Sequence, residues 1–204
     1  MFTDHFLPFL LTAILIELTP GPNMAWLALT GASVGKRAAL AATAGIALGL
    51  AIVAAIAAFG LAELAQLSPH IFDLLRYGGA AYLFWLAWQA WTGKGDVSPE
   101  QAHNGAQMWF RHGLFLNLLN PKAALFFVAI LPNYVDPSRP VMPQTFLLSA
   151  TYVAIATFVH LALALLSSQA HEWFRRGDNA SVLRRICAVL IAGAALWFII
   201  ATAG

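Results

Sequence analysis

Two proline-containing points interrupt otherwise apolar stretches of this 204-residue chain, and they limit what it can fold into. The first is Thr19-Pro20-Gly21-Pro22-Asn23, and the second is Leu119-Asn120-Pro121-Lys122. A proline inside a helix removes one backbone donor and clashes with an upstream carbonyl, so each interruption leaves free amide and carbonyl groups. Lipid cannot bond such groups, which are tolerated only beside a cavity or a polar partner. One interrupted segment in each half of a membrane chain is typical of a transporter whose site lies near the bilayer midplane.

Long apolar stretches account for most of the chain. It is 60% hydrophobic and only 10% charged, whereas an ordinary soluble domain is about 25% charged. A helix needs roughly 17 to 25 residues to cross a bilayer, and six apolar stretches reach such a length. They cover residues 6–34, 38–60, 71–92, 113–135, 143–170 and 186–204. We therefore expect an all-α, polytopic membrane protein in which residues 1–204 form one transmembrane domain of six helices.

The two halves of the chain follow the same pattern. Because each half has three spans, an odd number, the second half crosses the membrane in the orientation opposite to the first. This predicts a 3+3 inverted repeat. The halves are residues 1–92 and 112–204, and the polar segment 93–111 is expected to be a flexible cytoplasmic linker. Helices one and four of this repeat are expected to be broken at Pro20–Pro22 and at Pro121.

Basic residues predict the orientation in the membrane. Eight of the eleven lie in the loops that follow spans one, three and five: Lys36, Arg37, Lys94, Arg111, Arg175, Arg176, Arg184 and Arg185. Because basic residues near helix ends are retained in the cytoplasm, we expect these loops to be cytoplasmic and both termini to lie outside.

Small and aromatic residues give two further expectations. Span two carries Gly45 and Gly49 among many alanines, a pattern that lets helices approach closely. Its use is either packing within the bundle or formation of a homodimer. Most tryptophans, Trp109 among them, fall near predicted span ends and are expected to anchor the protein at the membrane interface.

Several classes of function lack their sequence signals. The single Cys187 cannot support a disulfide, a thiolate metal cluster or dithiol redox chemistry. The chain shows no glycine-rich nucleotide loop, metal-ligand cluster or paired nucleophile and base, so we expect no enzymatic activity, no metal and no cofactor. The net charge of +2 is spread over loops, which argues against nucleic acid as a partner.

Three ionisable residues lie at membrane depth: Glu17, Lys122 and His160. A charge at the bilayer centre costs on the order of 2.5 to 3.5 kcal/mol, so each needs a partner or a purpose. Free amides at a restarted helix attract a carboxylate, and free carbonyls near Glu17 attract an ammonium. The combination favours a zwitterionic substrate such as an amino acid. The predicted substrate-binding residues are Glu17, Thr19, Pro20, Gly21, Pro22, Asn23, Asn117, Asn120, Pro121 and Lys122.

Plainer interpretations of the same residues remain open. Glu17 and Lys122 either bind substrate or form an ion pair that fixes the broken helices together or gates the site. His160 is either a neutral core residue or, with Glu17, a candidate for proton coupling. Asn23, Asn117 and Asn120 either contact substrate or cap backbone groups that the breaks leave free.

The order of these motifs resembles the lysine-exporter (LysE/RhtB) family of amino-acid exporters along almost the full length of the chain. The segments that carry the resemblance are Leu18–Asn23, Gly45 with Gly49, Gly78–Leu83, Asn117–Lys122, and Phe126, Phe127 and Pro132. The resemblance implies a multi-pass exporter in the prokaryotic plasma membrane that expels amino acids or related small metabolites. It also implies energy from the proton gradient or the membrane potential, and neither catalysis nor a cofactor.

Two other functions compete with export by alternating access. A passive channel for small molecules or ions is the main alternative, and it would not move a solute against its gradient. A membrane-embedded enzyme or thiol redox carrier is disfavoured by the lone cysteine and by the missing catalytic constellation.

Overall fold

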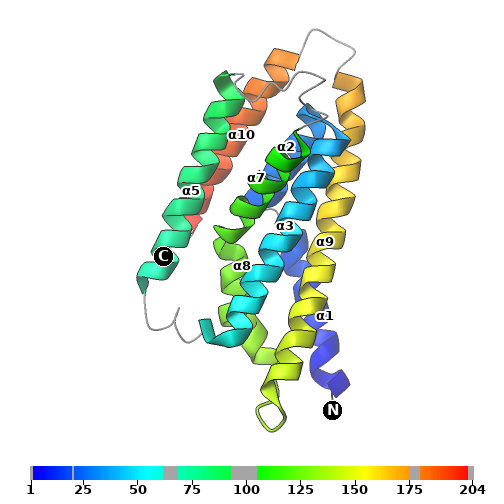
Figure 1. The fold of residues 1–204 in the computed structure, drawn as a ribbon, viewed down its shortest axis with the longest axis vertical. Coiled ribbons are helices and arrows are strands. Elements are labelled where there is room, and N and C mark those ends of the chain that lie inside the picture. The colour runs from blue at the N-terminus through cyan, green and yellow to red at the C-terminus, as the bar shows by residue number, and fades with distance from the viewer. Residues whose placement is uncertain (1, 20, 62–68, 93–104, 175–179, 202–204) are drawn as a thin grey trace.

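The computed structural model describes residues 2–19, 21–61, 69–92, 105–174 and 180–201, and in these ranges it contains helices and no strand (Figure 1). The predicted all-α class is confirmed there. The α-helices are α1 (Phe2–Leu18), α2 (Pro22–Ser33), α3 (Lys36–Ile56), α5 (Pro69–Thr92), α7 (Ala106–Leu118), α8 (Pro121–Leu125), α9 (Val141–Phe174) and α10 (Ala180–Ala201). Short π-helices η1 (Ala57–Leu61) and η2 (Phe126–Ile130) and the 3₁₀-helix η3 (Leu131–Tyr134) extend α3 and α8.

Two described helical segments, Lys36–Phe59 and Val141–Gln169, are long and apolar enough to cross a membrane. Two helix pairs also reach that length if each counts as one span. Phe6–Leu18 is bent by 54° against Asn23–Ser33, and Ala106–Leu118 is bent by 48° against Lys122–Tyr134. The described residues thus hold two to four candidate spans, and the arrangement of six spans as an inverted repeat stays a prediction.

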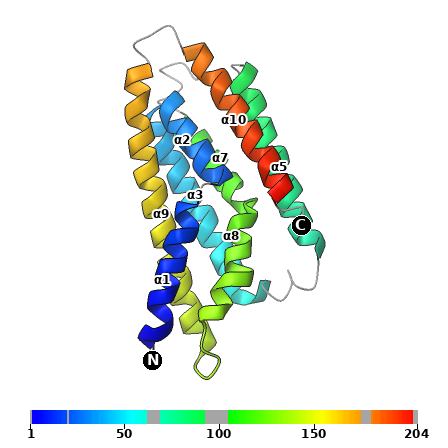
Figure 2. The same cartoon turned by 180° about the vertical axis from the view of Figure 1, so that it is seen from behind.

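The helices form a bundle in which α3 lies against both α7 and α9 (Figure 1). Helices α5 and α10 lie side by side along one flank, and α10 joins this pair to α2 (Figure 2). In both views α1 and α8 occupy the lower half of the bundle, and α2 and α7 occupy the upper half. Each bend therefore lies near mid-height.

The buried apolar residues separate into two clusters, one in each half of the bundle. The upper core contains Trp26, Leu27, Ala38, Ala39, Ala42, Ile46, Leu83, Leu86, Ala87, Trp109, Leu116, Ala164, Ile191 and Ala195. The lower core contains Phe9, Ala13, Leu50, Ala54, Ala123, Phe126, Phe127, Leu131, Leu148, Tyr152 and Ala156. The level of the two bends lies between these cores.

Glycines allow α3 and α7 to pack with their backbones in contact. A Cβ atom on Gly45 would collide with the carbonyl oxygen of Phe110, and one on Gly113 would collide with that of Ala42. A Cβ atom on Gly49 would lie 2.9 Å from the carbonyl oxygen of Leu114. The small residues of α3 therefore serve packing within the bundle.

Two sequence expectations need correction in this region. The linker was expected to extend to residue 111, but α7 already begins at Ala106, while residues 93–104 lie outside the described ranges. Trp109 was expected at the membrane interface, but it is buried. Trp109, Gly113 and Leu116 recur at helical spacing on the buried face of α7, so the helix starts early enough to place this tryptophan against α2.

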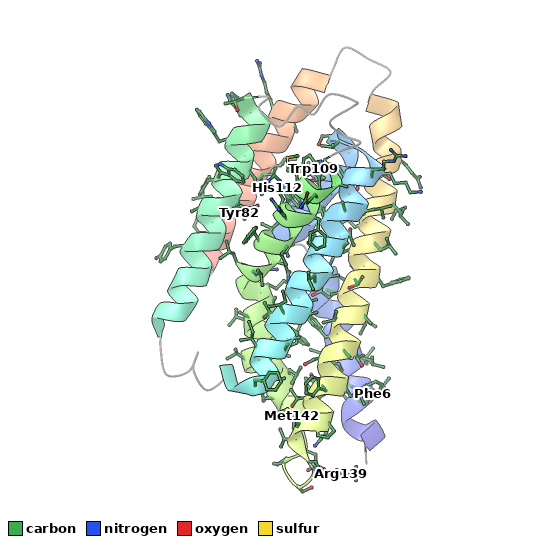
Figure 3. The ribbon with its side chains drawn as sticks, in the orientation of Figure 1. Phe6, Tyr82, Trp109, His112, Arg139 and Met142 are labelled. Carbon is green, nitrogen blue, oxygen red and sulfur yellow. The ribbon has the colours of Figure 1, made fainter. Side chains whose placement is uncertain are left out.

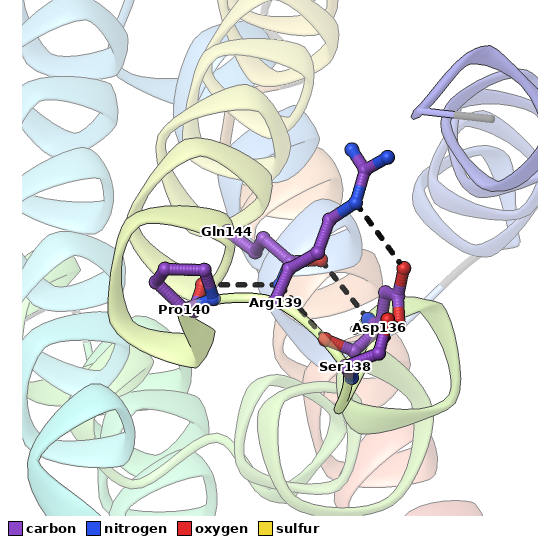
Figure 4. A network of polar contacts seen from close by, with 5 residues as sticks. All are labelled: Asp136, Ser138, Arg139, Pro140 and Gln144. Atoms are coloured by element: carbon purple, nitrogen blue, oxygen red, sulfur yellow. Dashed lines mark hydrogen bonds and ion pairs between the residues drawn. The ribbon is translucent and has the colours of Figure 1, made fainter.

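A polar network fixes the connection between η3 and α9 (Figure 4). The Gln144 side chain donates to the carbonyl oxygens of Asp136 and Pro140 and accepts from the Asp136 amide, each at 3.0 Å. The Arg139 Nε atom lies 3.5 Å from an Asp136 carboxylate oxygen. Gln144 thereby connects the first turn of α9 to the loop that precedes it. Figure 3 places Arg139 at this lower end and His112 with Trp109 in the upper half.

Candidate functional site

The first break separates α1 from α2. Helix α1 ends at Leu18, and α2 begins at Pro22. The amide of the first helical residue has no partner within the helix, so a proline at this position costs no hydrogen bond. Gly21 caps α2 in an extended conformation and has no side chain that could bond the free amides. The Thr19 hydroxyl turns back to donate to the Leu15 carbonyl oxygen at 2.9 Å. The first break therefore lacks a side-chain cap of its own for α2.

The second break separates α7 from α8 and is capped locally. Helix α7 ends at Leu118, and α8 begins at Pro121. The Asn120 side-chain oxygen accepts from the Lys122 amide at 3.0 Å, and its carbonyl oxygen accepts from the Ala123 amide at 3.1 Å. Asn120 thus follows the end of α7 and caps the start of α8.

Two side-chain hydrogen bonds connect the breaks to each other. The Lys122 Nζ atom donates to the Thr19 carbonyl oxygen at 3.0 Å, so the cation of the second break caps the end of α1. The Asn23 Nδ2 atom donates to Asn117 Oδ1 at 2.7 Å in a buried bond. Segments about one hundred residues apart in sequence therefore meet at one level of the bundle.

A cavity lies where the two breaks meet. The described residues that line it are Glu17, Gly21, Asn23, Met24, Leu50, Asn117, Asn120, Lys122, Ala123, Tyr152 and His160. The empty space within it is about 320 Å³, which includes its part open to the outside, and the enclosed part has room for about one water molecule. Leu50, Ala123 and Tyr152 belong to the lower core, so the cavity sits directly on that core.

Glu17 and Tyr152 form a buried polar pair beside the cavity. Glu17 is 4% exposed and Tyr152 is 1% exposed. The tyrosine hydroxyl donates to the Glu17 Oε1 atom. The Tyr152 ring stacks on Phe126 with 3.5 Å between ring centres and meets the edge of Phe127. The carboxylate is therefore held by a donor that aromatic packing fixes in place.

Glu17 and Lys122 do not contact each other as an ion pair in the described part of the chain. The carboxylate of Glu17 accepts from Tyr152, and the ammonium of Lys122 donates to a backbone carbonyl. Both charges line the same cavity all the same. Each is bonded to a neutral partner, so neither charge is neutralised by the other.

Three polar atoms of the lining are buried without a hydrogen-bond partner among the described residues. They are Asn23 Oδ1, Asn117 Nδ2 and His160 Nδ1. His160 is 5% exposed and lies eight residues after Tyr152 on α9, two helical turns along the same face. The polar face of α9 at the cavity therefore consists of Tyr152 and His160.

Most predicted site residues come together here. Glu17, Gly21, Asn23, Asn117, Asn120, Lys122 and His160 line the cavity. The carbonyl oxygen of Thr19 accepts a hydrogen bond from Lys122 beside the cavity. Pro22 is the first residue of α2 and Pro121 is the first residue of α8, while Pro20 lies outside the described residues. The structure also adds Met24, Leu50, Ala123 and Tyr152, which sequence reasoning missed. The hydroxyl of Tyr152, two turns before His160 in an apolar segment, is the signal that could have revealed it.

The described residues contain no group of three or more histidine, cysteine, aspartate or glutamate side chains that could hold a metal ion. The chemistry of the cavity is instead that of a binding site. It offers one carboxylate, one ammonium, an imidazole, a phenol hydroxyl and three amides, together with the apolar surfaces of Met24, Leu50 and Ala123.

Comparison with known proteins gives a consistent set of relatives. Residues 14–202 match the family described as LysE type translocator. The homoserine/homoserine lactone efflux protein of Salmonella typhimurium is 30% identical over 180 residues, which cover 87% of each chain. The leucine efflux protein of an Enterobacter species is 30% identical over 167 residues, which cover 80% of this chain and 79% of the relative. No solved structure matches the chain.

Proposed function

Because the chain belongs to the LysE family of translocators, we propose that it is a secondary active exporter of amino acids or closely related small metabolites. The family consists of transporters, so the protein is a transporter and not an enzyme. Two relatives are named for the efflux of leucine and of homoserine or its lactone. Leucine and homoserine are zwitterions, which agrees with the substrate that the charges of the site favour, whereas a homoserine lactone keeps the amino group but has no free carboxylate.

The observation that carries the proposal is the direct connection of the two breaks at one polar cavity. Lys122 reaches across to the Thr19 carbonyl, and Asn23 bonds Asn117. A ligand in the cavity would touch both halves of the chain at once, as a transporter built from two repeats requires. We propose the ten predicted residues with Tyr152 as the substrate site.

The proposed cycle is alternating access around this cavity. The enclosed space holds about one water molecule, so the structure corresponds to a closed state that must open to admit an amino acid. The upper core and the lower core lie on either side of it. Separation of the helices around one core would open the site to one face of the membrane, and separation around the other core would open it to the opposite face.

Lys122 is the proposed switch between these states. A substrate carboxylate that binds the Lys122 ammonium competes with the Thr19 carbonyl, because an ammonium is attracted more strongly to a carboxylate, which carries a full negative charge, than to a neutral carbonyl. Loss of the bond to Thr19 frees the end of α1 to move. Glu17 and His160 are the proposed proton carriers, and the driving force is the proton gradient or the membrane potential.

We place the protein in the bacterial plasma membrane as one transmembrane domain, with residues 1–92 and 112–204 as its repeats and with both termini outside. Bacterial relatives described as membrane proteins support this location. A protease site added at either terminus should be cleaved from outside intact cells, and cleavage only in disrupted cells would reverse the orientation. A homodimer remains a separate proposal, to be tested by measuring the mass of the purified protein in detergent.

Vesicles that contain the purified protein test the proposed export directly. They are loaded with labelled leucine, homoserine or another amino acid, and an imposed pH gradient or membrane potential should drive the label against its own gradient. Lys122→Ala and Glu17→Gln should each reduce the rate, while Lys36→Ala, an exposed lysine away from the cavity, should not. Efflux that neither gradient can drive uphill would favour the passive channel. Release no faster than from protein-free vesicles for every amino acid would refute the proposal.

A further inference from the structure

The amide pair formed by Asn23 and Asn117 leaves two polar atoms unused at the cavity. Asn23 is 4% exposed and Asn117 is 2% exposed. Their mutual bond uses the nitrogen of Asn23 and the oxygen of Asn117. The Asn23 oxygen and the Asn117 nitrogen are buried without partners among the described residues. A buried polar atom without a partner costs about 1 to 3 kcal/mol, so a pair of them at a binding cavity calls for a ligand.

The pair always offers one acceptor and one donor. Each amide has one oxygen and one nitrogen, and one atom of each takes part in the mutual bond. If both amides were turned over, the roles of the two residues would be exchanged, but one oxygen and one nitrogen would still be left. The amide pair is therefore matched to a ligand that carries a donor and an acceptor close together.

We infer that the amide pair binds both charged groups of a zwitterionic substrate and selects α-amino acids with uncharged side chains. Asn23 Oδ1 accepts from the substrate ammonium, and Asn117 Nδ2 donates to the substrate carboxylate. This inference rests on the proposed function and names the substrate class of that same site. It goes beyond the charge pattern of Glu17 and Lys122, because it assigns discrimination to two neutral residues.

The rest of the lining limits the substrate side chain. Glu17 is opposite in charge to the ammonium of the amino acid, and Lys122 is opposite in charge to its carboxylate. Met24, Leu50 and Ala123 are apolar, and the Tyr152 hydroxyl already bonds Glu17. The described lining holds His160 but no second carboxylate and no second ammonium that would pair with a charged side chain. An uncharged side chain is the one that this surface fits.

An aspartate at either position converts the pair from one donor and one acceptor to two acceptors. In Asn23→Asp, the Asn117 amide turns to donate to the new carboxylate, so the free atoms are two oxygens. In Asn117→Asp, the Asn23 nitrogen keeps its bond, and the free atoms are again two oxygens. Either variant loses the donor for the substrate carboxylate and keeps acceptors for its ammonium.

The experiment compares leucine with leucinamide, which lacks the carboxylate, and with N-acetyl-leucine, which lacks the ammonium. For the wild-type protein, leucine should raise the unfolding temperature in detergent and compete for transport, while the two analogues, lysine and glutamate should act at least about tenfold more weakly. In Asn23→Asp and Asn117→Asp, the preference for leucine over leucinamide should fall by about tenfold or more. Asn133→Asp makes the same exchange at an exposed asparagine of η3 and should keep the wild-type preference.

The outcomes separate this inference from the proposed function. If the wild-type protein transports amino acids but binds leucine and leucinamide equally, or prefers lysine, the inference is wrong and the exporter stands. The same holds if both aspartate variants fold, as size-exclusion chromatography would show, and keep the wild-type preference. If either variant fails to fold, the other carries the same expectation, and the wild-type comparison needs neither. Transport of no amino acid by the wild-type protein refutes both proposals.

Discussion

The two breaks have similar sequences but are stabilised differently. At the second break, Asn120 bonds the Lys122 amide with its side chain and the Ala123 amide with its carbonyl, so the start of α8 is capped from within. At the first break, Gly21 offers α2 no side-chain cap, and the end of α1 is bonded by Lys122 from the other half of the chain. The second break is thus locally complete, whereas the first depends on it.

In the proposed cycle, this difference would separate a fixed part of the site from a movable one. Helix α7 also packs backbone to backbone against α3, which holds the second break in place. Among the described residues, three side-chain hydrogen bonds join the first break and its flanking residues to the rest of the site: Lys122 with Thr19, Asn23 with Asn117, and Tyr152 with Glu17. A substrate that replaces any of these contacts would release the first break while the second stays in place.

The largest effect is expected for Lys122→Ala. The change removes the only charge of the second break and leaves the Thr19 carbonyl without its partner. A hydrogen bond that involves a charged group contributes about 1.5 to 3 kcal/mol, so transport should fall by about tenfold to a hundredfold. The measurement is the initial rate of amino-acid efflux from loaded vesicles.

Lys36→Ala is the matched control for this substitution, since Lys36 is exposed at the start of α3. It should transport at the wild-type rate. A Lys122→Ala protein that is folded and equally active would show that the first break does not depend on the second, and the proposed switch would be abandoned.

Tyr152→Phe should have the next largest effect, on stability. The phenylalanine keeps the stack on Phe126 but removes the donor to the buried Glu17 carboxylate. We expect a loss of about 2 kcal/mol in the free energy of unfolding, because a buried charged acceptor loses a partner. Denaturant unfolding of the protein in detergent measures this loss.

Tyr134→Phe provides a control with the same atomic change. The Tyr134 hydroxyl bonds Thr12 at 2.7 Å, a neutral and partly buried pair, so its loss should cost about 1 kcal/mol. Equal losses for the two tyrosine variants would show that the bond to Glu17 is not charge-assisted, and the first break would then have one strong contact fewer.

Asn120→Ala tests whether the second break is locally complete. Removal of an N-terminal capping asparagine costs about 1 kcal/mol, and the Lys122 amide is the group that loses its partner. The unfolding free energy should fall by that amount, while transport should fall less than in Lys122→Ala. A larger loss of transport in Asn120→Ala than in Lys122→Ala would reverse the roles assigned to the two breaks.

The helix ends at the two proline motifs could be predicted because proline and its neighbours act locally. The ends of α1 and α7 and the starts of α2 and α8 fall at the predicted motifs, and the charged residues beside them line the cavity. The direct partners could not be predicted in the same way. The bonds between Lys122 and Thr19 and between Tyr152 and Glu17 join distant segments, and they depend on how α9 packs against α1 and on where the start of α8 lies relative to the end of α1. The burial of Trp109 likewise follows from the contact of α7 with α2 and α3, not from its place near a predicted span end.

Gly21→Ser is the smallest change and the most specific test of the difference between the breaks, because it gives the first break the cap that it lacks. Gly21 has an extended conformation suited to a capping serine, and a Cβ atom there would meet only the Lys122 Cδ atom at an ordinary 3.6 Å. The exchange should raise the unfolding free energy by a few tenths of a kcal/mol, which is the usual difference between glycine and serine at a cap. If mobility of the first break limits the cycle, the same variant should export more slowly although it is more stable. A variant that is more stable and exports faster would show that motion of the first break does not limit transport. The difference between the two breaks would then bear on the stability of the protein and not on its transport rate.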